Sequence, residues 1–241
     1  MKPTVSINNY ILALVVMFFM LLVGMLMKAR YRLPSETDVV LPVYGEKEVP
    51  RAVPVAIPVE ETVQETRAYK QGDWWVLPKP SLIVSRANEA DTLRIRSGNK
   101  EDVFVLYFVD AAEASWIRPS RLHEQSDYFL KAPVESVLSS GNEALAWVSQ
   151  LLHDYPFKVY TKWGRVPDTE RYYAFITVEA EPGKQFDLGE MLVRRGYGMP
   201  LGLQAKPLPD ALPPLDRYKA LLGKALAMAK QERAGAWAFS P

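Results

Sequence analysis

Residues 103–113 read Val-Phe-Val-Leu-Tyr-Phe-Val-Asp-Ala-Ala-Glu, an apolar run that ends in two acids. β-Branched and aromatic residues favour strands, so the run predicts a buried strand. Asp110 and Glu113 follow it three positions apart, which places both carboxyl groups in one loop. Taken alone, these acids are most simply solvated loop residues. Placed together with Asp91 they predict an acidic pocket.

Further strand and helix patterns surround this run. Strands are expected at 81–85, 92–96, 157–161 and 172–178, with a turn at 97–100. Helices are expected from the capping-box spacing Ser140–Glu143, from an acid cap at Asp187 as far as Gly196, and over Leu215–Ala234. Together they predict an α+β fold in which a five-stranded OB-type β-barrel is packed with about three helices.

The composition excludes several kinds of site. The chain has 241 residues and no cysteine, so disulfides, thiolate zinc sites, iron–sulfur clusters and cysteine nucleophiles are ruled out. Its 29 basic and 28 acidic residues give a net charge of +1. The whole chain therefore has no electrostatic preference for nucleic acid, although a groove on a neutral domain can still be basic.

The N-terminal part of the chain differs from the rest in composition, because an uncharged apolar stretch is followed by a proline-rich acidic one. Residues 10–27 contain no charged side chain, and 18 helical residues span about 27 Å, so a single transmembrane helix is predicted. No small-residue cleavage site follows, which favours an uncleaved anchor over a secretory signal. We expect an anchor at 1–32, a proline-rich acidic linker at 33–70 and a folded domain at 71–241. The side of the membrane stays open, with extracytoplasmic weakly favoured.

Five segments of the folded domain resemble motifs of the staphylococcal nuclease (thermonuclease, SNase-like) family. In order they are Ala90–Leu93, Leu106–Glu113, Asp168–Ala174, Leu192–Tyr197 and Ala227–Trp237. The resemblance extends over about residues 80–238. It implies an OB-type barrel and a calcium-dependent phosphodiesterase that acts on DNA or RNA.

The resemblance also implies a role for individual residues. Asp91 and Asp110 would bind Ca²⁺, and the Ala111 carbonyl could add a ligand. Glu113 would orient or deprotonate water, and Arg171 would hold the phosphate. This set suits the chemistry, because calcium takes oxygen ligands and phosphodiester hydrolysis needs cationic groups on the phosphate oxygens.

Two departures from the family pattern put catalysis in doubt. Val105 stands where the family has an arginine, and loss of such a charged donor costs about 10²–10³ in rate. Glu170 replaces a glycine beside Arg171. Four other arginines are candidates for the missing charge: Arg94, Arg96, Arg118 and Arg121. The sequence leaves open whether hydrolysis survives.

Two functions follow from these observations. The first is a membrane-tethered, calcium-dependent endonuclease that acts on single-stranded nucleic acid. The second is a catalytically weakened barrel that serves as a membrane-anchored binding or assembly module. A protein partner could bind through the linker 33–70 or through the insertion 115–139, which contains Trp116. The simplest interpretation of this insertion, and of a second one at 200–214, is a surface loop.

Overall fold

The computed structural model describes residues 67–240. The strands are β1 (Tyr69–Gln71), β2 (Trp74–Val76), β3 (Ser81–Leu82), β4 (Thr92–Ser97), β5 (Lys100–Leu106), β6 (Asp110–Ala111), β7 (Phe157–Arg165), β8 (Arg171–Glu181), β9 (Lys184–Asp187) and β10 (Gly198–Met199). The helices are α2 (Pro119–Tyr128), α3 (Val134–Asp154), α4 (Leu188–Arg194), α5 (Leu215–Gln231) and the 3₁₀ helix η2 (Gly235–Phe239).

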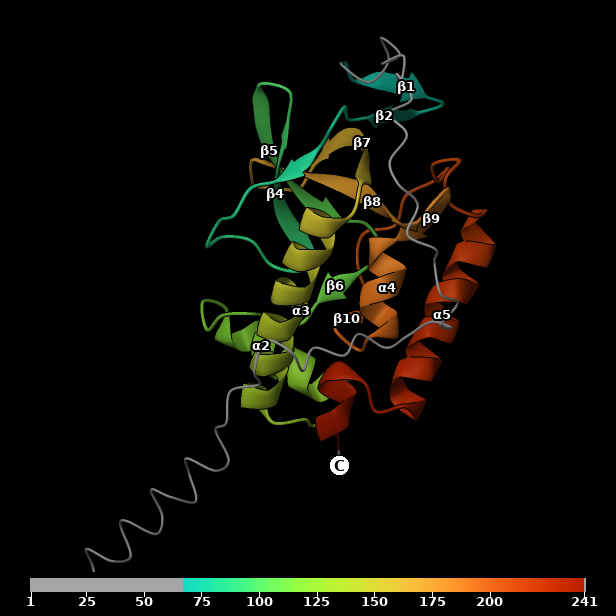
Figure 1. Ribbon diagram of the computed structural model, residues 1–241. Helices are drawn as coiled ribbons and strands as arrows, with labels where there is room; N and C mark the ends of the chain where they lie inside the picture. Colours follow the sequence, from blue (N-terminus) through green and yellow to red (C-terminus); the bar gives the residue numbers. More distant parts are fainter. Residues whose placement is uncertain (1–66, 241) are drawn as a thin grey trace, which may run out of the picture. The chain divides into compact units, whose positions relative to one another are not determined.

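Eight of these strands form one mixed sheet with the order β1-β2-β7-β8-β5-β4-β3, and β9 pairs with β8 (Figure 1). All pairs are antiparallel except β5 and β8, which run parallel with Val103 opposite Arg171. A separate two-stranded sheet pairs β6 with β10, so that Asp110 lies opposite Met199. The α+β class is confirmed.

The predicted five-stranded OB-type barrel is wrong, because the sheet is open. Its end strands, β1 and β3, do not pair with each other within residues 67–240. The chain passes from β2 to β3 through a short segment that contains Pro78 and Pro80. Proline has no N–H to donate, so Pro78 and Pro80 interrupt strand hydrogen bonding in this segment. The sequence prediction also missed the short strands β1, β2, β6, β9 and β10.

The run that begins at Val103 is not one continuous strand. β5 ends at Leu106, and Phe108 adopts a left-handed conformation with φ of 62°. The Phe108 amide then donates to the Leu203 carbonyl at 2.9 Å. The chain turns there, and Asp110 therefore lies in the second sheet rather than at the end of β5.

The helix predicted from Ser140 starts earlier than expected. α3 begins at Val134, so Ser140 lies inside the helix and the proposed capping box is wrong. Ser140 is 1% exposed. A Cβ added to Gly141 would lie 2.1 Å from the Glu113 carbonyl oxygen. This face of α3 therefore packs directly on the backbone of the loop that carries the acids.

The other two helix predictions are confirmed. Asp187 caps α4, and its Oδ2 accepts a hydrogen bond from the Glu190 amide at 2.8 Å. Gly196 follows the helix with φ of +70°, a conformation that suits glycine. α5 covers Leu215–Gln231, close to the predicted 215–234.

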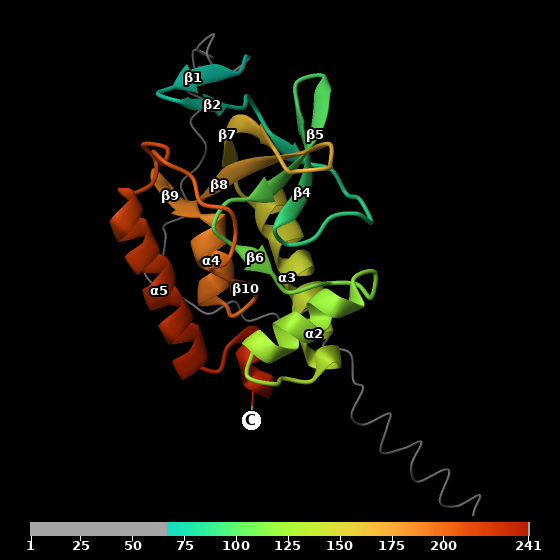
Figure 2. The ribbon, with the colours of Figure 1, turned by 180° about the vertical axis from the view of Figure 1, so that it is seen from behind.

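The insertion 115–139 is not a surface loop. It forms α2 and the first residues of α3, and it closes a second hydrophobic cluster against the C-terminal helix η2 (Figure 2). Leu122, Phe129, Val137 and Trp237 are buried in this cluster. The loop with Asp110 and Glu113 runs between the main core and this second cluster, because Ala111 belongs to the first and Ala112 to the second. The second insertion, 200–214, contains no helix or strand.

The prediction of a single-pass membrane protein is not supported and stands corrected. No helix within residues 67–240 is long and apolar enough to cross a membrane. The predicted anchor, 10–27, lies outside the described residues, as does the linker up to residue 66.

Candidate functional site: an acidic cluster bridged by arginines

The structure brings Asp91, Asp110 and Glu113 into one cluster. Asp91 lies just before β4, Asp110 begins β6, and Glu113 follows β6. Asp91 Oδ2 accepts a hydrogen bond from the Ala111 amide at 2.8 Å, which ties the two loops together. Its Oδ1 accepts from the Thr92 hydroxyl at 3.1 Å. Asp91 is 7% exposed and Glu113 is 2% exposed.

Two arginines bridge the acids. Arg121 Nε donates to Glu113 Oε1 at 2.8 Å, and its Nη2 forms an ion pair with Asp110 Oδ1. Arg118 Nη2 donates to both carboxylate oxygens of Glu89 at 2.6 Å. The same Arg118 nitrogen lies 3.0 Å from Glu113 Oε2. Positive and negative groups therefore alternate along the cluster.

The Gln125 side chain fixes the backbone of the loop that carries Asp110 and Glu113. Its Oε1 accepts from the Glu113 amide and its Nε2 donates to the Ala111 carbonyl, both at 2.8 Å. Gln125 is 2% exposed, so neither bond competes with bulk water. The Ala111 carbonyl that the resemblance offers as a metal ligand is thus already a hydrogen-bond acceptor.

Burial dominates the electrostatics of the three acids. It raises the pKa of Asp91 to about 7, and the nearby charge of Asp110 adds to this increase. Burial also raises the pKa of Asp110, although Arg121 opposes the shift. The pKa of Glu113 is raised first by burial and then by the charge of Glu89. Desolvation therefore outweighs the arginines, and the neutral carboxyl is favoured most at Asp91.

Arg171 is not part of this cluster. It begins β8 opposite Val103, and within the described part of the chain its guanidinium forms no hydrogen bond or ion pair. Val105 lies two residues further along β5, opposite Thr92 on one side and Tyr173 on the other. The predicted phosphate ligand therefore contacts none of the three acids.

The residues present do not fit a calcium ion in this arrangement. Calcium takes six to eight oxygen ligands. In residues 67–240 no group of three or more His, Cys, Asp or Glu side chains is placed to hold a metal. Asp110 and Glu113 are paired with Arg121, and the Asp91 oxygens accept hydrogen bonds. A cation would have to displace Arg121 first.

Sequence reasoning found Arg118 and Arg121 only as two of four candidates, and it missed Glu89 and Gln125. One signal was available, because residues 118, 121 and 125 follow helical spacing and share one face of a helix. Treating the insertion as a loop concealed that spacing. Nothing in the sequence near Glu89 indicates its contact with Arg118.

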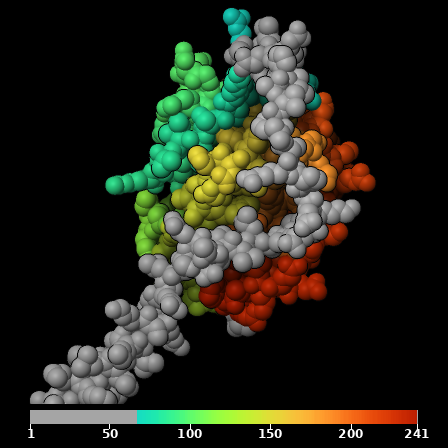
Figure 3. All heavy atoms as spheres, in the orientation of Figure 1, coloured from blue at the N-terminus to red at the C-terminus, as the bar shows by residue number. Residues whose placement is uncertain are grey.

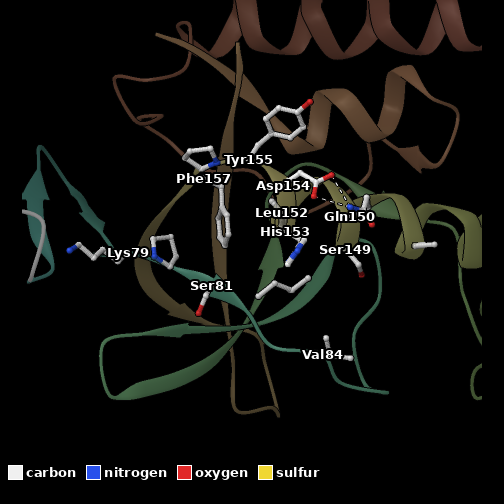
Figure 4. Close-up of a pocket in the computed structure, with 14 residues that line it drawn as sticks. Lys79, Ser81, Val84, Ser149, Gln150, Leu152, His153, Asp154, Tyr155 and Phe157 are labelled. Atoms are coloured by element: carbon white, nitrogen blue, oxygen red, sulfur yellow. Dashed lines mark hydrogen bonds between the residues drawn. The ribbon is translucent and has the colours of Figure 1, made fainter. Parts of the chain in front are cut away.

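A hollow of about 710 Å³ lies away from the cluster, lined by Lys79–Leu82, by the last turns of α3 and by residues 155–157 (Figure 4). Figure 3 shows this side of the domain, with the teal strands beside yellow α3. Asp154 Oδ1 and Oδ2 each accept from Gln150 Nε2 at 2.8 Å. None of the cluster residues lines this hollow. This hollow and the concentrated charge of the cluster are therefore in different places.

Comparison with protein-family models and with curated proteins gives no match for this chain. The resemblance to the staphylococcal nuclease family accordingly stays a prediction that rests on the five sequence segments.

Proposed function

We propose that the domain is a binding or assembly module that contains a nuclease-like cluster of acids but does not hydrolyse phosphodiesters. One observation carries the proposal: Arg121 joins Glu113 to Asp110, so the carboxylates that a hydrolase would need for water and metal are held in ion pairs.

Glu113 is poorly placed to activate water. It is 2% exposed, its Oε1 accepts from Arg121, and its Oε2 faces Arg118. A general base must be within hydrogen-bond reach of the proton it removes. Val105 supplies no charge for the transition state, and Arg171 does not contact the acids. The predicted hydrolysis needs a base that can reach water and a cationic group beside the acids to bind the phosphate. This arrangement meets neither requirement.

The insertion offers a contact surface next to the cluster. Trp116 and Ile117 are 51% and 85% exposed, and they directly precede Arg118 and α2. Adjacent exposed large apolar residues are typical of protein-contact sites, and tryptophan is enriched among residues that dominate binding energy. A protein partner is favoured over nucleic acid, because Arg118 and Arg121 are already paired with carboxylates.

Hydrolysis is tested on the full-length protein with single-stranded DNA and RNA, in Ca²⁺ and in EDTA, with Glu113→Gln as the matched variant. We expect no cleavage above the buffer control in any condition. Cleavage that requires Ca²⁺ and disappears in both EDTA and Glu113→Gln would overturn the proposal in favour of the nuclease.

Binding is tested by placing a photo-crosslinking amino acid at Ile117, in the cells that produce the protein. The control position is Leu221 on α5, which is 40% exposed and lies in another part of the fold. We expect one discrete protein adduct from position 117, lost in Trp116→Ala, and none from position 221. Equal labelling at both positions would argue against a contact surface at the insertion.

A further inference from the structure

We propose that the outer edge of β3 and the hollow beside it bind an extended peptide of a protein partner, and that this peptide adds to the sheet as one more strand. The peptide would have apolar side chains at alternate positions and an acidic residue among them. Neither the cluster residues nor Trp116 line the hollow, so this site goes beyond the proposed function and does not depend on it.

The outer edge of β3 carries backbone groups that have no hydrogen-bond partner within residues 67–240. β3 is an end strand of the sheet, and it pairs with β4 alone. The Ile83 amide donates to the Arg94 carbonyl of β4 at 2.9 Å. Successive residues of a strand direct their N–H and C=O groups to opposite edges, so those of Leu82 face away from the sheet. Such an edge is a template for another extended chain.

The side chain of Asn88 extends this register one residue beyond β3. Its Nδ2 donates to the Ile83 carbonyl at 2.8 Å, and its Oδ1 accepts from the Arg94 amide at 3.0 Å. The Ile83 carbonyl therefore faces β4. In a trans peptide the following N–H points the opposite way, so the Val84 N–H also faces away from the sheet. An incoming strand can thus pair with both Leu82 and Val84.

A second margin of the sheet borders the same hollow, at the start of β7. The Leu77 amide donates to the Val159 carbonyl at 3.1 Å, just past the end of β2. The Pro156 carbonyl accepts from the Glu179 amide of β8 at 2.8 Å. By the same alternation, Phe157 directs its N–H and C=O to the side on which β2 no longer runs. The hollow therefore lies between two sheet margins, one on β3 and one on β7.

The walls of the hollow offer apolar surface to the side chains of the added strand. Its apolar lining includes Leu82, Val84, Leu152, Tyr155 and Phe157, around a volume of about 710 Å³. The Val84 side chain is 95% exposed. A peptide seated on the edge of β3 would remove part of this surface from water, which favours binding. Main-chain hydrogen bonds and pockets for alternate side chains are the two parts of recognition by strand addition.

Charge favours an acidic residue in the peptide. Lys79 borders the hollow on one side of Phe157, and the exposed His153 lies on the other side (Figure 4). Asp154 is the one carboxylate among the lining residues, and both its oxygens accept from Gln150 Nε2 at 2.8 Å. A glutamate of the peptide would therefore meet a lysine and a histidine, while the nearby carboxylate already has a donor.

The test measures amide hydrogen exchange and binding by NMR on the full-length protein. The probe is the synthetic peptide Glu-Val-Thr-Val-Thr-Val-Thr-Glu, and its control is the same peptide N-methylated at every valine and threonine, which keeps the side chains and removes the N–H donors. We expect the probe to slow exchange at Leu82 and Val84 by about tenfold or more at saturation. The N-methylated control should leave exchange at both residues unchanged.

Two pairs of variants separate the edge from the hollow. Val84→Pro removes an outward N–H and should weaken peptide binding by about tenfold, whereas Val84→Ala keeps the N–H and should weaken it by less than about threefold. Ala146→Trp fills the hollow from α3 and should also weaken binding by about tenfold. Glu143→Trp is its control, because Glu143 is exposed on α3 and does not line the hollow.

Several results would overturn the inference. They are equal binding of the N-methylated peptide, binding that neither Val84→Pro nor Ala146→Trp weakens, and unchanged exchange at Leu82 and Val84 at every soluble concentration of the probe. If Val84→Pro does not fold, Ala146→Trp decides alone.

Two further results would assign the edge to another occupant and so overturn the inference as well. A dimer of the protein alone that Val84→Pro abolishes would assign the edge to a second copy. Slow exchange at Leu82 and Val84 in dilute protein without peptide would assign it to another part of the same chain. Crosslinking at position 117 tests the proposed function separately, since Ile117 does not line the hollow.

Discussion

Asp91 and Asp187 are two buried aspartates that the fold uses differently. Each is 7% exposed, and each accepts a backbone N–H bond at 2.8 Å, from Ala111 and Glu190 respectively. Burial raises the pKa of both, to about 7 and about 6. Asp187 Oδ2 also accepts a hydrogen bond from the Tyr218 hydroxyl at 2.7 Å, whereas Asp91 lies beside the charged Asp110.

The difference shows what each carboxyl group requires. Neutral donors from the start of α4 and from α5 satisfy Asp187, so it serves as a helix cap inside one core. Asp91 belongs to a cluster that needs cationic partners, and α2 supplies Arg121 to it.

The largest effect is expected from Gly141→Ala, which disturbs the acidic cluster without changing its charge. The added Cβ would lie 2.1 Å from the Glu113 carbonyl oxygen, so α3 or the loop must move. We expect a loss of about 3–4 kcal/mol in the free energy of unfolding. Gly223→Ala on α5 is the control, because nothing lies within 4 Å of its Cβ, and it should gain about 0.5–1 kcal/mol. Equal urea midpoints for the two variants would contradict the packing described here.

The pH dependence of stability separates the two aspartates. An unfolded aspartate titrates near pH 3.9, whereas the folded pKa is about 6 for Asp187 and about 7 for Asp91. Between these values the folded state binds more protons, so each group lowers stability as pH rises through that window. In Asp187→Asn the stability relative to wild type should rise by about 2 kcal/mol from pH 4 to pH 7.

The same comparison for Asp91→Asn should extend the rise to a higher pH, near 8. Urea unfolding at three pH values measures both differences. A stability difference that does not change with pH would mean that burial does not control these carboxyls.

Asp187→Ala removes the acceptor for both the Glu190 amide and the Tyr218 hydroxyl. At pH 5 we expect a loss of about 2 kcal/mol, from the helix cap and from the buried hydroxyl left without a partner. Tyr218→Phe removes the donor alone and should cost about 1 kcal/mol. If Tyr218→Phe costs as much as Asp187→Ala, the cap contributes nothing.

The smallest effect is expected from Arg96→Ala, which breaks an ion pair outside the cluster. Arg96 pairs with Glu101 at 2.5 Å, but its side chain is 54% exposed. Exposed ion pairs contribute little, so the change should stay within about 0.5 kcal/mol. A loss of about 2 kcal/mol or more, measured by urea unfolding, would contradict the assignment of this contact as a surface ion pair.

The sequence predicted local features that depend on nearby residues. The turn at Ser97–Lys100 and the cap at Asp187 rest on short patterns, whereas the convergence of Asp91 with Asp110 was expected only from the family resemblance and from the joint placement of the acids. It failed where distant packing decides. Ser140 is inside α3 because that face of the helix packs on the loop at residues 112–113, and no local signal reveals this contact.

The topology and the arginines failed for similar reasons. Whether the sheet closes depends on pairing between its end strands, β1 and β3, and no local pattern in the sequence reveals that they do not pair within residues 67–240. The roles of Arg118 and Arg121 depend on α2, a helix in a segment for which the sequence predicts a surface loop. A resemblance to one family assigns roles only to the positions that match its motifs, so it gives no information about residues in an inserted helix.

The most direct test of the account is a crystal structure of the full-length protein grown in CaCl₂, with anomalous scattering measured to locate calcium. The account predicts that Arg121 bridges Asp110 and Glu113 and that no calcium peak lies at the cluster. Calcium bound by Asp91 and Asp110, with Arg121 displaced from both carboxylates, would contradict it.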